Sequence, residues 1–129
     1  MSSNYLLDSS VLIPWLRRDP VIRQHLAEEA SLYVSTVALG ELYYGAEKSV
    51  HVEKSLAEVG AMINTVTILT VDSATATIYG RIKYEQQVKG LMLPDNDLWI
   101  AATAMQYGLT LATRDHHFNW LDGLALEQW

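Results

Sequence analysis

Residues 93–115, LPDNDLWIAATAMQYGLTLATRD, predict a helix that runs directly into a strand. Pro94 marks the start of the helix, Gly108 is suited to its end, and the segment between them is mostly apolar. The run LTLAT at 109–113 is short and apolar, as expected for a buried strand. A helix that leads into a strand is the repeating unit of an α/β fold.

Two aspartates stand at the start of this helix, Asp95 and Asp97, on either side of Asn96. Asp and Asn are favoured at helix N-caps because their side-chain oxygens accept hydrogen bonds from free backbone N–H groups. Negative charge there also suits the positive end of the helix dipole. Capping explains one acidic residue well and two only loosely, so we expect Asp95 or Asn96 to cap and Asp97 to have another role.

The same alternation of strand and helix extends along the chain. Four more apolar runs predict strands: YLL at 5–7, SLYVST at 31–36, VTIL at 66–69 and LALE at 124–127. Helical segments are expected between them at 10–17, 20–30, 37–49 continuing to about 64, and 73–90. Because helices rather than hairpins connect the strands, the sheet should be parallel and covered on both faces. The prediction is a three-layer α/β/α fold with a central parallel sheet of four to five strands.

Length and composition limit the class of protein. A chain of 129 residues is expected to form a single domain over residues 1–129. Its net charge of −6 argues against a non-specific nucleic-acid coat, although an acidic nuclease remains possible. The absence of cysteine excludes disulfides and cysteine zinc sites. No apolar run approaches roughly twenty residues, and no basic signal-peptide region opens the chain, so we expect a cytoplasmic location and no membrane contact.

Acidic residues occur where the predicted strands end. Asp8 follows the first strand, Asp115 follows the fourth, Asp97 opens the helix that leads into the fourth, and Glu41 lies in the helix after the second. In open α/β sheets ligands bind beyond the carboxyl ends of the strands. These four side chains are therefore expected to converge at one end of the sheet.

Converging carboxylates repel one another, and a divalent cation removes that repulsion. Carboxylate oxygens suit hard ions such as Mg²⁺ or Mn²⁺, and a site of this kind suits phosphodiester hydrolysis. Local roles remain open for each acid. Asp8 could cap the following helix, Asp115 could stabilise a turn, and Glu41 could pair with an arginine.

Four stretches of the sequence resemble the PIN-domain ribonucleases, and among them the VapC-type toxins of toxin–antitoxin pairs. They are YLLDSSVLI, STVALGELYYGAEKS, LPDNDLWIAATAMQYGLTLATRD and TRDHHF, in the order of the family and over nearly the whole chain. The resemblance implies a PIN fold, endoribonuclease activity on RNA, a homodimer and a cognate VapB-type antitoxin.

The resemblance also implies residue roles. Asp8, Glu41, Asp97 and Asp115 would form the catalytic, metal-binding cluster for Mg²⁺ or Mn²⁺, with Asp8 and Asp97 as its principal ligands. Asp95 would be a cap or rim residue. Thr113 could add a hydroxyl near the metal. Arg114 could contact a substrate phosphate, or form a surface ion pair instead.

Other classes fit the sequence less well. A haloacid-dehalogenase-like phosphatase needs a second aspartate two residues after the first, where this chain has Ser10. A receiver-like regulatory domain needs a lysine after the last of these strands, and none follows LTLAT. Two alternatives within the same family remain open. One is a non-catalytic PIN-like module that binds RNA or protein, and the other is a housekeeping PIN nuclease outside a toxin pair.

Overall fold

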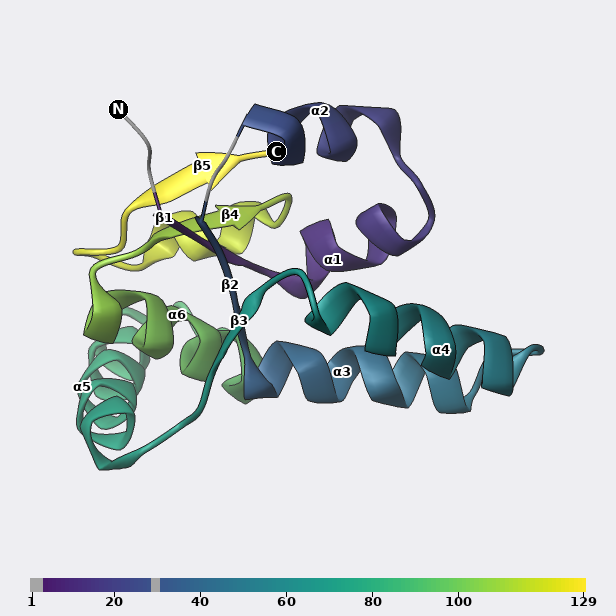
Figure 1. The fold of residues 1–129 in the computed structure, drawn as a ribbon. Helices are drawn as coiled ribbons and strands as arrows, with labels where there is room; N and C mark the ends of the chain where they lie inside the picture. Colours follow the sequence, from purple (N-terminus) through teal and green to yellow (C-terminus); the bar gives the residue numbers. More distant parts are fainter. Residues whose placement is uncertain (1–3, 29–30) are drawn as a thin grey trace.

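The computed structural model of the protein describes residues 4–28 and 31–129, and its centre is a five-stranded sheet (Figure 1). The strands lie side by side in the order β3-β2-β1-β4-β5, and every neighbouring pair is parallel. Their bounds are β1 Asn4–Leu7, β2 Ser31–Ser35, β3 Thr67–Leu69, β4 Thr110–Thr113 and β5 Leu126–Gln128. The predicted parallel sheet is confirmed, with five strands.

Helices flank the sheet on both sides and connect the strands. Figure 1 shows α5 and α6 packed together on one side, and α1, α3 and α4 on the other. Their bounds are α1 Ser9–Leu16, α2 Pro20–Glu28, α3 Thr36–Glu47, α4 Val52–Ile63, α5 Ser73–Lys89 and α6 Asp95–Tyr107, with a 3₁₀ helix, η1, over His116–Trp120. The three-layer α/β/α prediction is confirmed. Among the described residues, no helix has both the length and the apolar character that crossing a membrane would require.

Helix ends follow local capping chemistry. The Ala38 N–H donates to Ser35 Oγ (3.1 Å), which ends β2 and begins α3. Asp72 caps α5 in the same way, and Gly108 ends α6 in the left-handed conformation with φ 65°. The helix predicted at 37–49 and the further helix predicted to about 64 are observed as α3 and α4, with a turn between them. The predicted end of α2 at Ala30 lies outside the described residues.

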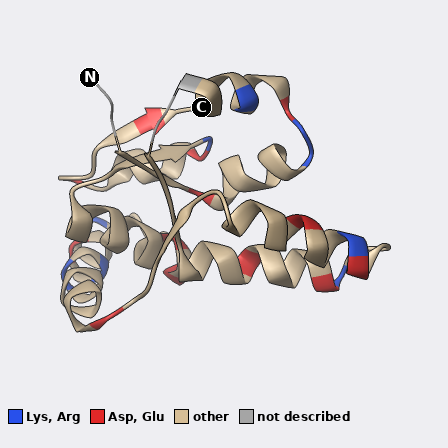
Figure 2. Ribbon diagram, viewed as in Figure 1, with Lys and Arg blue, Asp and Glu red and all other residues tan. Residues whose placement is uncertain are grey.

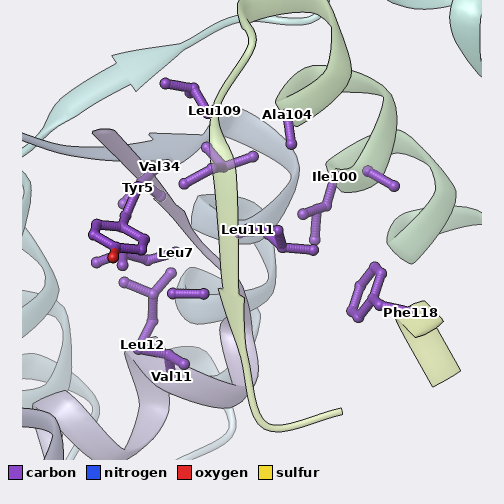
Figure 3. Packing of buried hydrophobic residues seen from close by; sticks show 14 of the residues in the cluster. Tyr5, Leu7, Val11, Leu12, Val34, Ile100, Ala104, Leu109, Leu111 and Phe118 are labelled. Carbon is purple, nitrogen blue, oxygen red and sulfur yellow. The ribbon is translucent and has the colours of Figure 1, made fainter. Parts of the chain in front are cut away.

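The core fills the space on both faces of β1 and β4. Figure 3 shows Leu111 of β4 pointing toward Ile100 of α6, with Phe118 beside them and Leu7 of β1 on the other side of β4. These four side chains are completely buried. Burial on both faces explains why the strands read as continuous apolar runs. It also fixes the last residues of β1 and β4 next to each other, with Leu7 opposite Ala112.

The order of the strands creates a switch point between β1 and β4. The chain leaves β1 toward β2 and β3 on one side, and β4 and β5 lie on the other side of β1. In open α/β sheets, a crevice opens beyond the carboxyl ends of the strands at such a point. The residues that follow Leu7 and Thr113 border this crevice.

Candidate active site

Asp8 leaves β1 at the switch point and is almost fully buried, with 2% of its surface exposed. Its backbone N–H donates to the Ala112 carbonyl of β4 (3.0 Å). One carboxylate oxygen, Oδ2, accepts hydrogen bonds from the hydroxyls of Ser10 (2.7 Å) and Thr113 (2.9 Å). The other, Oδ1, is buried without a hydrogen-bond partner among the described residues. Asp8 does cap α1 through the Ser10 N–H, and that role leaves Oδ1 unsatisfied.

Ser10 and Thr113 form a hydroxyl clamp around Asp8. Their hydroxyl oxygens are 3.2 Å apart, and Ser10 Oγ also accepts the Arg114 N–H at 2.9 Å. The Asp115 N–H donates to Thr113 Oγ1 at 2.9 Å. The Thr113 hydroxyl thus lies against Asp8, while a role of this hydroxyl near a metal stays a prediction. The supporting role of Ser10 was missed. Ser10 could have been found from its place two residues after Asp8, a position that was weighed only as evidence against a phosphatase.

Glu41 reaches the same end of the sheet from α3, where that helix meets α1. Its Oε1 is buried and has no hydrogen-bond partner in the described part of the chain, while Oε2 accepts a long hydrogen bond from the Ser9 hydroxyl (3.5 Å). Burial raises the pKa of Glu41, the negative charge of Asp8 raises it further, and the Ser9 hydrogen bond opposes both. Tyr44, one turn further along α3, is 67% exposed, so Glu41 lies on the border of the core rather than within it.

Asp97 occupies the first turn of α6 and is half-buried. Burial is the largest cause that raises its pKa, to about 6, and the charges of Asp8, Asp115 and Glu41 each add to the rise. His117 lowers the pKa by a smaller amount. Each of the other three predicted acids thus acts electrostatically on Asp97, as expected for acids that converge on one end of the sheet.

Asp115 follows β4 and caps η1. Its Oδ1 accepts the His117 N–H at 2.9 Å and lies 2.9 Å from the His117 ring nitrogen Nδ1. The local turn role considered for Asp115 is therefore real, and it holds the imidazole of His117 next to the acids. His117 in turn meets Trp120 edge to face, with ring centroids 4.8 Å apart.

The oxygen donors of the site suit a cation better than the distances between the acids do. Within residues 4–28 and 31–129, no three Asp, Glu or His side chains lie close enough together to hold a metal ion as they stand. Two buried carboxylate oxygens nevertheless have no hydrogen-bond partner in the described part of the chain, and leaving buried charge unpaired is costly. The donors are all oxygens, which matches Mg²⁺ or Mn²⁺. The residues therefore fit such an ion, provided that the acids draw closer around it.

Asp95 has a different role from the one predicted. The residue before α6 is Pro94, which offers no side-chain cap, and the helix begins at Asp95 itself. Asp95 Oδ1 instead accepts hydrogen bonds from the Tyr79 hydroxyl (2.8 Å) and Lys83 Nζ (3.0 Å), both on α5. The prediction that Asp95 or Asn96 caps α6 was wrong, because the helix begins at Asp95 and the Asp95 carboxylate accepts hydrogen bonds from α5 instead.

Arg114 forms the ion pair considered as its alternative role. Its guanidinium nitrogens lie 3.3 Å and 3.4 Å from the two carboxylate oxygens of Asp19, in the turn before α2. The hydrogen bond from Arg114 is the main reason that the pKa of Asp19 is lowered. A contact between Arg114 and substrate stays a prediction, and it would require this pair to open.

The fold and the site together define a class of α/β/α domains that collect carboxylates at the switch point of a parallel sheet. Comparison with protein families matches residues 5–124 to the family model described as the PIN domain. The chain therefore belongs to the PIN-domain family, with curated relatives in its VapC branch, as the sequence motifs implied.

Individual similar proteins match this chain over nearly the whole length of both sequences. The chain is 32% identical to Ribonuclease VapC2 of Haemophilus influenzae over 128 residues, covering 97% of each protein. It is 31% identical to the tRNA(fMet)-specific endonuclease VapC of Shigella flexneri, again over 97% of each. A solved structure of VapBC2 from Rickettsia felis, bound to a DNA fragment from its promoter, superposes with a TM-score of 0.91 at 26% identity, covering 97% of this chain and 98% of the other.

Proposed function

We propose that this chain is a metal-dependent endoribonuclease and the toxin of a type II toxin–antitoxin pair. One observation of the site carries the proposal. Beside the switch point, two buried carboxylate oxygens, Asp8 Oδ1 and Glu41 Oε1, have no hydrogen-bond partner among the residues that the structure describes. The curated relatives of similar length are ribonucleases, which supports RNA as the substrate. The activity is hydrolysis of RNA phosphodiester bonds.

The acids divide the work of the site. Asp8, through Oδ1, and Asp97 would bind Mg²⁺ or Mn²⁺, and Asp115 would complete the set. When bound, the cation would lower the pKa of a coordinated water and neutralise charge on the phosphoryl oxygens. Ser10 and Thr113 donate hydrogen bonds to Asp8 Oδ2, which would leave Oδ1 free to bind the ion.

Glu41 is the residue best placed to take a proton. Its raised pKa makes it a better base near neutral pH than an ordinary carboxylate. In the proposed step, the oxygen of water attacks phosphorus and its proton passes to Glu41 Oε1. The bond from phosphorus to one ribose oxygen breaks, and Glu41 gives the proton that it took from water to that oxygen, which restores the carboxylate.

Cleavage of RNA by the purified chain, free of any partner, tests this function. Total RNA and initiator tRNA would be incubated with Mg²⁺ or Mn²⁺, with EDTA, and with the Asp8→Asn and Asp122→Asn variants. Asp122 is the matched control, because it is an exposed aspartate paired with Lys89 (2.7 Å). We expect cleavage that EDTA and Asp8→Asn abolish and Asp122→Asn preserves. A folded chain that cleaves neither RNA, or that cleaves equally in EDTA, would contradict the proposal.

The same proposal includes a VapB-type antitoxin as partner, in line with the VapBC complexes that the chain superposes on. A groove of about 310 Å³ beside α1 is a candidate place for it, because it combines an apolar floor with two arginines. It is lined by Trp15, Leu16, Arg18, Arg23, Glu58, Ala61, Met62 and Thr65. If an antitoxin segment binds there, Arg23→Glu should weaken co-purification with the antitoxin and leave RNA cleavage by the free chain intact.

A further inference from the structure

The 3₁₀ helix η1 directs two aromatic side chains outward, while the residues that alternate with them face the core. Phe118 is completely buried, and Leu121, directly after the helix, is nearly so. His117 and Trp120 are exposed, and Trp120 has 36% of its surface accessible. A 3₁₀ helix has three residues per turn, so positions 117 and 120 share one side and positions 118 and 121 share another. Burial of Phe118 and Leu121 therefore fixes η1 on the core and holds the other two rings outward.

These two rings adjoin the acid cluster. Asp115 accepts the His117 N–H at 2.9 Å, and its Oδ1 lies 2.9 Å from the ring nitrogen Nδ1. His117 also interacts electrostatically with Asp97 of α6. The indole of Trp120 meets the imidazole edge to face, with ring centroids 4.8 Å apart. The indole therefore stands one ring away from the carboxylates of the proposed metal site.

Trp120 differs from two other tryptophans, whose stacking positions are filled within the chain. Trp99 stacks on Tyr79 with ring centroids 3.8 Å apart and planes 5° from parallel. Trp129 stacks on His25 with centroids 4.7 Å apart and planes 6° from parallel. Trp120 meets its imidazole neighbour at 64°, and among the described residues no ring lies parallel to it. An exposed indole of this kind is suited to stacking on a flat ligand.

The charges around the site favour stacking over phosphate contacts as a source of affinity for RNA. The chain has a net charge of −6. Figure 2 shows a basic and an acidic segment side by side at the end of β4, where Arg114 is paired with Asp19 at 3.3 Å. Lys83 is likewise paired with Asp95 at 3.0 Å. Phosphate contacts need free cations, whereas an aromatic ring binds the π-face of a base without charge. A nucleobase therefore fits the surface at Trp120 better than a phosphate does.

We propose that the indole of Trp120 stacks on an unpaired RNA base next to the phosphate that is cleaved. This role deepens the nuclease function proposed above and rests on it. With the scissile phosphate at the acids, the stacked base fixes the neighbouring part of the strand on η1. A base within a duplex is already stacked on its neighbours, so the indole selects single strands, loops and bulges. It accepts any of the four bases, because each of them has a π-face.

Binding of RNA in EDTA tests the stacking in the absence of metal-dependent cleavage. The full chain would be titrated into a short, dye-labelled, single-stranded oligoribonucleotide of mixed sequence, and into its duplex, with fluorescence anisotropy as the readout. The matched control is Tyr107→Ala, because Tyr107 is 46% exposed and the whole length of α6 separates it from Asp97. We expect Trp120→Ala to raise the Kd for the single strand about tenfold. Trp120→Phe, which keeps a flat ring, should recover most of the affinity, and Tyr107→Ala should bind like the wild type.

Steady-state kinetics with Mn²⁺ separate this role from catalysis. Trp120→Ala should raise KM about tenfold and change kcat by less than about threefold, with an unchanged circular dichroism spectrum. A wild type without measurable affinity for the single strand, or a Trp120→Ala variant that binds it as tightly as the wild type, would overturn the proposal. So would a Trp120→Ala variant that loses only antitoxin binding, which would assign the ring to the antitoxin. A chain that binds RNA through Trp120 and cleaves none would contradict the nuclease function alone, and metal-dependent cleavage with an unchanged KM in Trp120→Ala would contradict the stacking alone.

Discussion

Asp95 and Asp97 lie two residues apart in the first turn of α6, yet their surroundings have opposite effects. Asp95 is exposed, and hydrogen bonds from Lys83 and then Tyr79 lower its pKa. Asp97 is half-buried, and burial followed by the charges of three other acids raises its pKa to about 6. The first carboxylate is satisfied within the chain, whereas the second is under strain that a cation would relieve.

Helix geometry explains the difference. Two residues along an α-helix are separated by about 200° around its axis, so adjacent acids point to nearly opposite sides. Asp95 faces α5, which supplies a lysine and a tyrosine hydroxyl. Asp97 faces the carboxyl ends of β1 and β4, where the charge of Asp8 and Asp115 reaches it. An aspartate in the first turn of a helix can therefore bind a neighbouring helix or join a catalytic site, depending on the side of the helix that it faces.

The largest expected effect is on catalysis. Asp97→Asn should lower the rate of RNA cleavage by at least about 100-fold, because it removes a charge that binds the cation. Asp95→Asn, two residues away, should change the rate by less than about threefold. The measurement is kcat/KM on one defined RNA for both variants. Equal losses in the two variants would erase the distinction between the two carboxylates.

Binding of the cation should be visible in stability. Wild-type protein with Mn²⁺ at 100 times its Kd should gain about 2.7 kcal/mol in free energy of unfolding, because the ion binds only the folded state. Asp97→Asn should lose most of this gain, and Asp95→Asn should retain it. Thermal unfolding with and without Mn²⁺ provides the readout. A gain of the same size in Asp97→Asn would place the ion elsewhere.

In the metal-free protein, the contributions of Asp95 and Asp97 to the free energy of unfolding should change with pH in opposite directions. The folded-state pKa of Asp97 lies above its unfolded value of 3.8, so its contribution is fully present below pH 3.8 and is lost as pH rises through about 6. Asp97→Asn should therefore stabilise the metal-free protein above pH 6, by about 1 kcal/mol, because solvent screening of a half-exposed carboxylate reduces the roughly 3 kcal/mol that the full shift would give.

For Asp95 the sign is reversed. Its folded-state pKa is lowered, so its contribution is present above pH 3.8 and is lost as pH falls through the folded-state pKa. Asp95→Asn should slightly destabilise the protein at neutral pH. Urea unfolding in EDTA at pH 4 and pH 7.5 would separate the two variants. A fall in stability for Asp97→Asn at pH 7.5 would contradict the idea that its charge is strained.

Among the substitutions expected to impair cleavage, the smallest loss is expected at the hydroxyl clamp. Ser10→Ala removes the hydroxyl that holds Asp8 Oδ2 and accepts the Arg114 N–H. We expect roughly a tenfold loss of cleavage, as is typical when a residue that orients a metal ligand is removed. Ser9→Ala is the matched control, since the Ser9 hydroxyl makes only a 3.5 Å contact with Glu41. If Ser9→Ala costs more than Ser10→Ala, Glu41 rather than Asp8 is the carboxylate that needs support.

Local chemistry made much of this fold predictable. The apolar runs placed all five strands within two residues of their observed ends, and Ser35 and Asp72 begin α3 and α5 as local side-chain caps. Asp8 and Asp115 could be placed because each follows a strand directly, and the ends of parallel strands meet at one edge. The first helix was expected to end at Ser49, two residues beyond its observed end at Glu47, since no proline or glycine marks the turn before α4.

The order of the helices and strands, and the acids that each of them brings to the carboxyl end of the sheet, could be predicted from the sequence alone. These features depend on residues that are close along the chain. Which carboxylates are satisfied depends on tertiary packing, because their partners come from distant segments. Lys83 of α5 pairs with Asp95, Asp19 holds Arg114, and Asp8 Oδ1 has no partner among the described residues. Burial and distance between charges are properties of the packed chain, and they separate Asp97 from Asp95.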